Sequence, residues 1–120
     1  MNKILVADDV HDLADSLSMF LNLTGYDTRT AYDGLQAVDA ANDDRPDVVI
    51  LDLNMPIMDG FEAARAIRDR YPSPPPVLVA VSALSVNSVK QRLDDCGFDH
   101  FLAKPADVEK LLAIVGAAGT

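Results

Sequence analysis

The stretch Val48-Val-Ile-Leu-Asp52-Leu-Asn54-Met-Pro56 decides the fold, because four consecutive apolar residues run directly into an acid. A short run without polar alternation is typical of a strand buried on both faces of a parallel sheet. In open sheets of this kind, ligands bind beyond the carboxyl ends of the strands. The sequence therefore predicts a strand over Val48–Leu51 and places Asp52 at the edge of the sheet that carries the chemistry.

Other apolar or β-branched runs predict four further strands: Lys3–Ala7, Asp27–Ala31, Val77–Val81 and Asp99–Leu102. Between the runs, apolar residues recur at the spacing of one helix face. The stripes are Leu13, Leu17, Phe20 and Leu21; Val86, Val89 and Leu93; and Val108, Leu111, Leu112 and Val115, with a weaker helix over residues 35–43. Five alternating strands and helices predict one (βα)5 doubly wound domain over residues 1–120, flavodoxin-like, with helices on both faces of a five-stranded parallel sheet.

Helix boundaries show matching signals. Gly25 and Gly97 stand where a left-handed C-terminal cap is expected, and Ser85 and Asp107 stand at N-cap positions. Asp33-Gly34 predicts a turn before the weaker helix. The proline-rich segment 72–76 is interpreted as a stiff, extended connection into the fourth strand.

Composition narrows the class of protein. The 120 residues are 49% hydrophobic and 24% charged, which is typical of one soluble globular domain. Nineteen acids against ten bases give a net charge of −9, which argues against nucleic-acid binding by the domain itself. A single cysteine, Cys96, excludes an intrachain disulfide and a cysteine zinc site, and it is interpreted as a buried hydrophobe. Without a signal-peptide core or a membrane span of roughly 20 residues, we expect a cytoplasmic protein with no membrane partner.

Polar residues follow four of the five predicted strands: Asp8-Asp9, Asp52 with Asn54, Ser82, and Lys104-Pro105. The carboxyl ends of parallel strands share one edge, so we expect these side chains to converge there. Crowded carboxylates repel one another unless a cation lies among them. Oxygen ligands without histidine or cysteine favour Mg²⁺ (or Mn²⁺), which Asp8 and Asp9 suffice to anchor.

Such a site is typical of phosphoryl transfer, which depends on positioning and on charge neutralisation. Asp52 is the predicted nucleophile, because the other two acids hold the ion. Lys104 and Ser82 are predicted to hold phosphoryl oxygens.

These motifs closely resemble the receiver domain of two-component response regulators, of the single-domain, chemotaxis-like type. The resemblance spans nearly the whole chain and includes Asp59-Gly60 after the Asp52 motif and Ala83 after Ser82. It implies that Asp52 accepts phosphate from a histidine kinase or a histidine phosphotransfer protein. It also implies that Asp9, Asp52 and the Asn54 backbone carbonyl bind Mg²⁺, with Asp8 acting through water.

The resemblance assigns further roles. Ser82 and Phe101 match the switch hydroxyl and the switch aromatic residue, and Asn54 and Leu84 match the positions that tune the lifetime of the phosphate. Lys104 matches the family's invariant lysine, and Lys104-Pro105 its cis peptide bond. Phosphorylation is then expected to change a face formed by the fourth helix, the fifth strand and the fifth helix, which binds an unknown downstream protein. The domain would catalyse its own phosphorylation and dephosphorylation without being a turnover enzyme.

The same residues bear on several alternatives. A calcium loop over residues 52–60 is excluded because its glycine is misplaced and no glutamate closes it. A dehalogenase-type phosphatase needs a second acid where Asn54 stands. A phosphorylation-independent interaction scaffold of the same fold stays open, as does the choice between a stand-alone regulator and part of a longer protein. The last helix lacks the arginine-rich character of regulators fused to winged-helix domains, and His11 and His100 are too scattered for a metal site.

Overall fold

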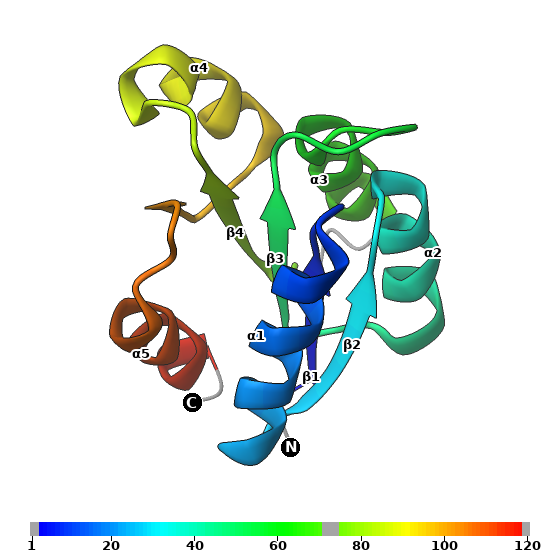
Figure 1. The fold of residues 1–120 in the computed structure, drawn as a ribbon. Coiled ribbons are helices and arrows are strands. Elements are labelled where there is room, and N and C mark those ends of the chain that lie inside the picture. Colours follow the sequence, from blue (N-terminus) through cyan, green and yellow to red (C-terminus); the bar gives the residue numbers. More distant parts are fainter. Residues whose placement is uncertain (1–2, 71–74, 119–120) are drawn as a thin grey trace.

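A single parallel sheet with a helix after each strand makes up the part of the chain that the computed structural model describes, residues 3–70 and 75–118 (Figure 1). The elements are β1 (Lys3–Ala7), α1 (His11–Leu23), β2 (Asp27–Ala31), α2 (Gly34–Asp44), β3 (Val48–Asp52), α3 (Gly60–Arg70), β4 (Val77–Ser82), α4 (Val86–Cys96), β5 (His100–Ala103) and α5 (Val108–Ala118). None of the helices described there is long and apolar enough to cross a membrane.

The strand order is β2-β1-β3-β4-β5, which puts β3 at the centre of the sheet. Alternate residues of a strand point to opposite faces, so each apolar strand contributes to two cores. On one face Val48 and Ile50 pack with α1 and α5, and on the other Val49 and Leu51 pack with α2, α3 and α4. This arrangement confirms the predicted doubly wound fold with helices on both faces.

The strand boundaries agree with the prediction to within one residue. β1 and β2 match it, whereas β3 and β4 each extend by one residue, to Asp52 and Ser82. Asp52 pairs with Val81, and Ser82 pairs with Ala103, so the polar residues that end these strands still belong to the sheet. The functional side chains of β3 and β4 are therefore held by ladder hydrogen bonds.

The fifth strand was predicted one residue too early. Asp99 is not part of β5, because its backbone N–H donates to the carbonyl of Leu78 and its carboxylate accepts from the N–H of Leu78, both at 2.9 Å. Asp99 thus closes the start of the strand pair from outside the ladder. Of the segment 72–76, which was predicted to be extended, residues 72–74 lie outside the described residues.

The helix caps are partly as predicted. Gly97 caps α4 with a φ of 82°, and Gly25 follows the end of α1 with a φ of 106°. The Asp107 carboxylate accepts from the N–H groups of Glu109 and Lys110 at the start of α5. Ser85 is the N-cap residue of α4, but its side chain makes no capping hydrogen bond.

Asp33 was predicted as a turn residue and is the N-cap of α2. Its buried carboxylate accepts from the N–H of Gln36 at 2.8 Å. The turn prediction missed the capping role of Asp33, because an aspartate carboxylate accepts the same kind of hydrogen bond from a nearby N–H in a turn and at an N-cap.

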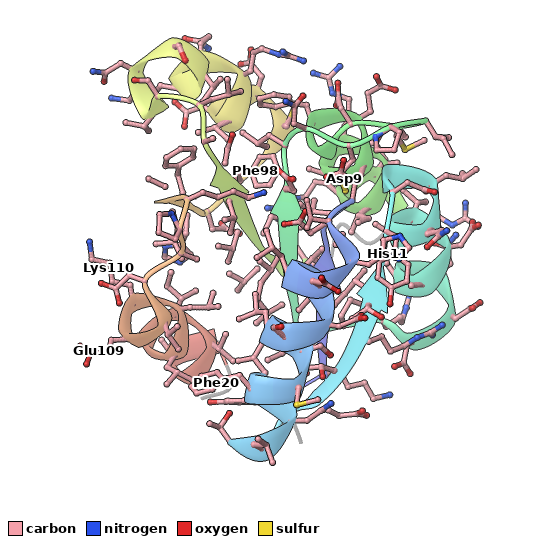
Figure 2. All side chains as sticks on the ribbon, in the orientation of Figure 1. Asp9, His11, Phe20, Phe98, Glu109 and Lys110 are labelled. Carbon is pink, nitrogen blue, oxygen red and sulfur yellow. The ribbon has the colours of Figure 1, made fainter. Side chains whose placement is uncertain are left out.

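The helix stripes are only partly buried. The inner members Leu21, Val89, Leu93, Leu111 and Val115 are buried, whereas Leu13, Phe20, Val86 and Val108 are between 36% and 50% exposed. Val86 belongs to the first turn of α4, which is exposed. The other three line an apolar groove of about 600 Å³ between α1 and α5, and Figure 2 shows Phe20 on the α1 side of it. Val86 therefore fits the spacing of the helix stripe but does not belong to the core.

The connection from β3 to α3 folds back tightly on the strand end. The N–H of Gly60 donates to the carbonyl of Leu53 at 3.1 Å, and a Cβ on Gly60 would overlap the carbonyl oxygen of Asp52. Only glycine allows α3 to begin this close to Asp52. Gly60 therefore helps to fix the position of the acid at the centre of the sheet.

We expect Gly60→Ala to lower the free energy of unfolding by about 1–3 kcal/mol, because the added methyl group must displace backbone. Gly116→Ala is the matched control, since a Cβ there would meet only the Tyr26 hydroxyl at 3.9 Å. In the control, alanine should stabilise α5 by about 0.5–1 kcal/mol through its helix propensity. Urea unfolding of both variants measures the two values, and equal effects would contradict the steric explanation.

Candidate functional site

Four strand ends bring the predicted site residues to one edge of the sheet. Asp8 and Asp9 follow β1, and Asp52 ends β3. One carboxylate oxygen from each of these three acids lies within 4.8 Å of the others. Figure 2 shows Asp9 near the start of α1, at the arrowhead end of the strands. The sheet thus produces the crowding of negative charge that the sequence predicts.

Lys104 supplies the positive charge of the cluster. Its Nζ lies 3.0 Å from Oδ2 of Asp52 and 3.1 Å from Oδ2 of Asp8. The backbone N–H of Lys104 donates to the carbonyl of Ser82 at 2.9 Å, and the Lys104–Pro105 peptide bond is cis. One ammonium group is therefore shared between two carboxylates that come from different strands.

Burial sets the electrostatics of Asp52, which is only 4% exposed. Desolvation raises the pKa of Asp52 above its usual 3.8, and the nearby charge of Asp8 adds to this, against the opposing hydrogen bonds from Lys104 and from the N–H of Asn54. Burial of Lys104 favours its neutral amine, but the bonds to Asp52 and Asp8 outweigh this and raise the pKa of Lys104 above 10.5. Lys104 therefore stays charged at neutral pH.

Two polar groups lie next to the acid cluster. Ser82 is 1% exposed, and its Oγ accepts from the N–H of Leu84 at 3.0 Å. The N–H of Asn54 donates to Oδ1 of Asp52 at 3.2 Å, while its side chain is exposed. Leu84 is 43% exposed. The two positions predicted to tune the phosphate lifetime are thus both open to solvent.

Phe101 lies on β5, two strands away from Asp52. It pairs with Ala80 of β4, and its ring is half-buried. A groove of about 280 Å³ between α4 and β5 is lined by Val86, Leu93 and Phe101, among others. The predicted switch residues Ser82 and Phe101 therefore come from neighbouring strands on the same side of the molecule as α4.

Two features next to the cluster were not predicted. His11, labelled in Figure 2, opens α1. It stacks on Tyr32 with ring centroids 3.9 Å apart, and the Tyr32 hydroxyl donates to Asp15 at 2.6 Å. His100 is exposed at the start of β5, apart from this pair. Ile57, in the loop after β3, has a φ of 71°, a left-handed conformation that costs a β-branched residue about 1–3 kcal/mol. No local sequence spacing joins position 11 to position 32 or marks isoleucine for a left-handed turn.

The donor set fits a hard divalent cation. Oxygen ligands from Asp8, Asp9 and Asp52 suit Mg²⁺ or Mn²⁺, and a cation there would oppose the burial that raises the pKa of Asp52. The groove between α1 and α5 also reaches Asp8, Asp52 and Lys104, which gives the cluster a second approach from the surface. The arrangement can hold a cation and an anionic group side by side.

A sequence model of the response regulator receiver domain matches residues 4–116. The response regulator MprA of Mycobacterium avium is 40% identical over 111 residues, which cover 92% of this chain and 48% of that protein. The transcriptional regulatory protein PrrA of Mycobacterium tuberculosis is 37% identical over 115 residues, 96% of this chain and 48% of that protein. This chain spans about half the length of these curated relatives.

Solved structures give the same family. The chemotaxis protein CheY4 of Vibrio cholerae is similar with a TM-score of 0.90 at 32% identity, over 98% of both chains. The receiver domain of the sensor histidine kinase PA1611 of Pseudomonas aeruginosa, which holds a magnesium ion in its active-site cleft, has a TM-score of 0.87 at 27% identity, over 99% of this chain and 98% of that one. The chain belongs to the response regulator receiver domain family, the signalling switches of two-component systems.

We expect Asp52→Asn to raise the free energy of unfolding of the metal-free protein at neutral pH. The substitution removes a buried charge but keeps an oxygen that accepts from Lys104. Because the pKa of Asp52 is raised in the folded state, the folded state binds the proton more tightly than the unfolded state. The wild type therefore gains stability as the pH falls through that folded pKa, and the advantage of the variant shrinks.

Urea unfolding in EDTA, from about pH 7 to about pH 4, measures this difference. Asp12→Asn is the control, since Asp12 is exposed in the first turn of α1 and should change stability little. A stabilisation by Asp52→Asn that is independent of pH would contradict the assignment.

Proposed function

We propose that residues 1–120 form one receiver domain that acts as a phosphorylation-dependent switch, with Asp52 as the phosphoacceptor. The observation that carries this proposal is the ammonium group of Lys104 shared between the buried carboxylates of Asp52 and Asp8. A fold needs no such group of charges for stability, because buried charges cost more than apolar side chains of similar size. The arrangement is accounted for by a reaction that brings a cation and a phosphoryl group to Asp52.

In this proposal Asp9, Asp52 and the backbone carbonyl of Asn54 hold Mg²⁺ (or Mn²⁺), with Asp8 acting through water. The acid cluster and the magnesium ion of the related PA1611 receiver domain support the assignment. A bound Mg²⁺ supplies positive charge that offsets the repulsion between the acids and the incoming phosphoryl oxygens.

The chemical step is a displacement at phosphorus. A carboxylate oxygen of Asp52 forms a bond to the phosphorus of a phosphohistidine, and the bond from phosphorus to the imidazole nitrogen breaks, with the electron pair leaving on that nitrogen. Lys104 binds one phosphoryl oxygen, and its raised pKa keeps it charged. The donor is a histidine kinase or a histidine phosphotransfer protein, as the similarity to response regulators suggests.

The output follows from the polar groups beside Asp52. Ser82 is proposed to turn its hydroxyl toward the phosphoryl group, and Phe101 to move toward the space that this leaves. Both residues lie on the side of α4, and the groove between α4 and β5 exposes Val86 and Phe101 for a partner. A downstream protein then reads the face formed by α4, β5 and α5.

Further parts of the proposal concern cell context. We propose a cytoplasmic protein without a membrane partner, and the net charge of −9 supports a domain that does not bind nucleic acid by itself. The domain changes its own phosphorylation state and is not proposed to turn over other substrates. A phosphorylation-independent scaffold of the same fold is the alternative, in which Asp52 carries no phosphate.

We expect incubation with Mg²⁺ and acetyl phosphate to give a single acyl phosphate, stable to acid and labile to base, that intact-mass spectrometry detects. EDTA should abolish the adduct, because the acid cluster repels a phosphodonor without a cation. Asp52→Asn should form none, while Asp12→Asn serves as the control outside the cluster and should label normally. Labelling of Asp52→Asn at the wild-type rate, or no adduct on the wild type, would favour the scaffold.

Leu84 generates a prediction about lifetime. Its side chain is apolar and exposed two residues after Ser82, so it cannot orient a water molecule toward the phosphate. We expect Leu84→Asn to speed loss of the phosphoryl group several-fold, because an amide there can position water. Phosphate release from the purified adduct measures the rate. Leu23→Asn, at an exposed leucine at the far end of α1, should leave the decay unchanged; slower or unaltered decay in Leu84→Asn would count against this role.

A further inference from the structure

Helix α4 is packed on the core by Val89, Leu93 and Cys96, but its arginine-mediated contacts with α3 lie at its C-terminal end. Its N-terminal residues Ser85, Val86 and Asn87 are exposed, and Ser85 gives no side-chain cap. A cavity of about 350 Å³ lies between α3 and the C-terminal half of α4 and is lined by Phe61, Arg65, Arg92 and Cys96, among others, so long side chains bridge the two helices there. Figure 1 shows the gold, C-terminal end of α4 on the side of α3 and the yellow, N-terminal end farther away.

Arg68 of α3 contacts the end of α4 and the residues that follow it. Its Nη2 donates to the carbonyl oxygen of Gly97, the C-cap of α4, and forms an ion pair with Oδ2 of Asp99 at 3.4 Å. The same Asp99 oxygen accepts from the N–H of Leu78 at 2.9 Å, at the start of β4. One guanidinium therefore links α3, the end of α4 and β4 in a single group of contacts.

Gly97 is required for this contact for two reasons. Its φ of 82° favours glycine, and a Cβ would lie 2.8 Å from Nε of Arg68. That Nε is buried without a hydrogen-bond partner among the described residues, so the arginine is held there by its other contacts. A buried donor without a partner costs about 1–3 kcal/mol, which the charge-assisted bonds of Nη2 must offset.

Two further arginines, Arg92 of α4 and Arg65 of α3, join the two helices near the same end of α4. The guanidinium of Arg92 lies over the ring of Phe61 at 3.8 Å, and Nη2 of Arg65 lies 3.8 Å from Sγ of Cys96. Phe61 also meets Phe98 edge to face, with centroids 6.3 Å apart. These contacts involve residues 92 to 99 of the α4–β5 segment and leave the first turn of α4 outside them.

We infer that Arg68 clamps the C-terminal end of α4, so that the helix pivots about this end and its N-terminal end is the one that moves during switching. The clamp itself does not depend on the proposed function, but the movement about it during switching rests on phosphorylation of Asp52. Leu78 and Asp99 lie at the amino edge of the sheet, whereas Ser82 lies at the carboxyl edge beside Asp52. A displacement that begins at Ser82 therefore reaches the free end of α4 first.

Amide hydrogen exchange of the unphosphorylated protein tests the clamp. In Arg68→Ala we expect exchange at the amides of Asp95 and Cys96 to rise at least about tenfold, the effect of losing a charge-assisted bond, while α1 is unchanged. Arg68→Lys keeps the charge opposite Asp99 and should rise less. Arg70→Ala, which removes an exposed arginine from the same helix, is the control and should match the wild type.

The clamp is overturned if Arg68→Ala leaves exchange at Asp95 and Cys96 unchanged, or raises exchange equally in α1, because both results deny a local contact. A second measurement compares free and acetyl phosphate-treated protein in Mg²⁺. In the wild type, the change in amide exchange on phosphorylation should affect the N-terminal residues of α4 and stop before Arg92. In Arg68→Ala the change should extend along α4 to Cys96. A wild-type change that reaches Cys96 rejects the pivot. Failure to form the adduct rejects the proposed function and the use of the pivot, while the first measurement judges the clamp on its own.

Discussion

The sharing of one ammonium group between two buried carboxylates is the constraint on which the site depends. Lys104 can reach Asp8 and Asp52 together only because β1 and β3 are neighbours and end at the same edge. Desolvation raises the pKa of Asp52, against the opposing hydrogen bond from Lys104. The site is therefore prepared for additional positive charge, which a fold built for stability alone would not require.

The fold was predictable because its signals are local. Wholly apolar runs such as Val48–Leu51 specify strands with two covered faces, and the order of strands and helices leaves few topologies. The errors occur where a residue has two possible uses. Asp99 bonds to Leu78 from outside the strand, and Asp33 caps a helix where a turn was predicted. Val86 fits a helix stripe, yet it lies in the exposed first turn of α4.

For the site, the strand-end rule named Asp8, Asp9, Asp52, Ser82 and Lys104, and the structure brings them together; their roles stay predictions. The contacts that it could not name join residues with no fixed spacing. His11 meets Tyr32 across two elements, and Arg68 meets Gly97 through the three-dimensional approach of α3 to α4. An arginine in a surface helix carries no sign of such a partner in the sequence, because its reach allows many positions.

The central place of β3 has a consequence for how information leaves the molecule. A strand with hydrogen-bonded neighbours on both sides has little freedom to shift, so β3 holds Asp52 in a fixed position. The four residues of β5 have a neighbour on one side only, and they carry Phe101 and lead to Lys104. Rearrangement is least costly at this edge of the sheet, so the residues of β5 can shift or be substituted while the acid cluster on β1 and β3 keeps its geometry.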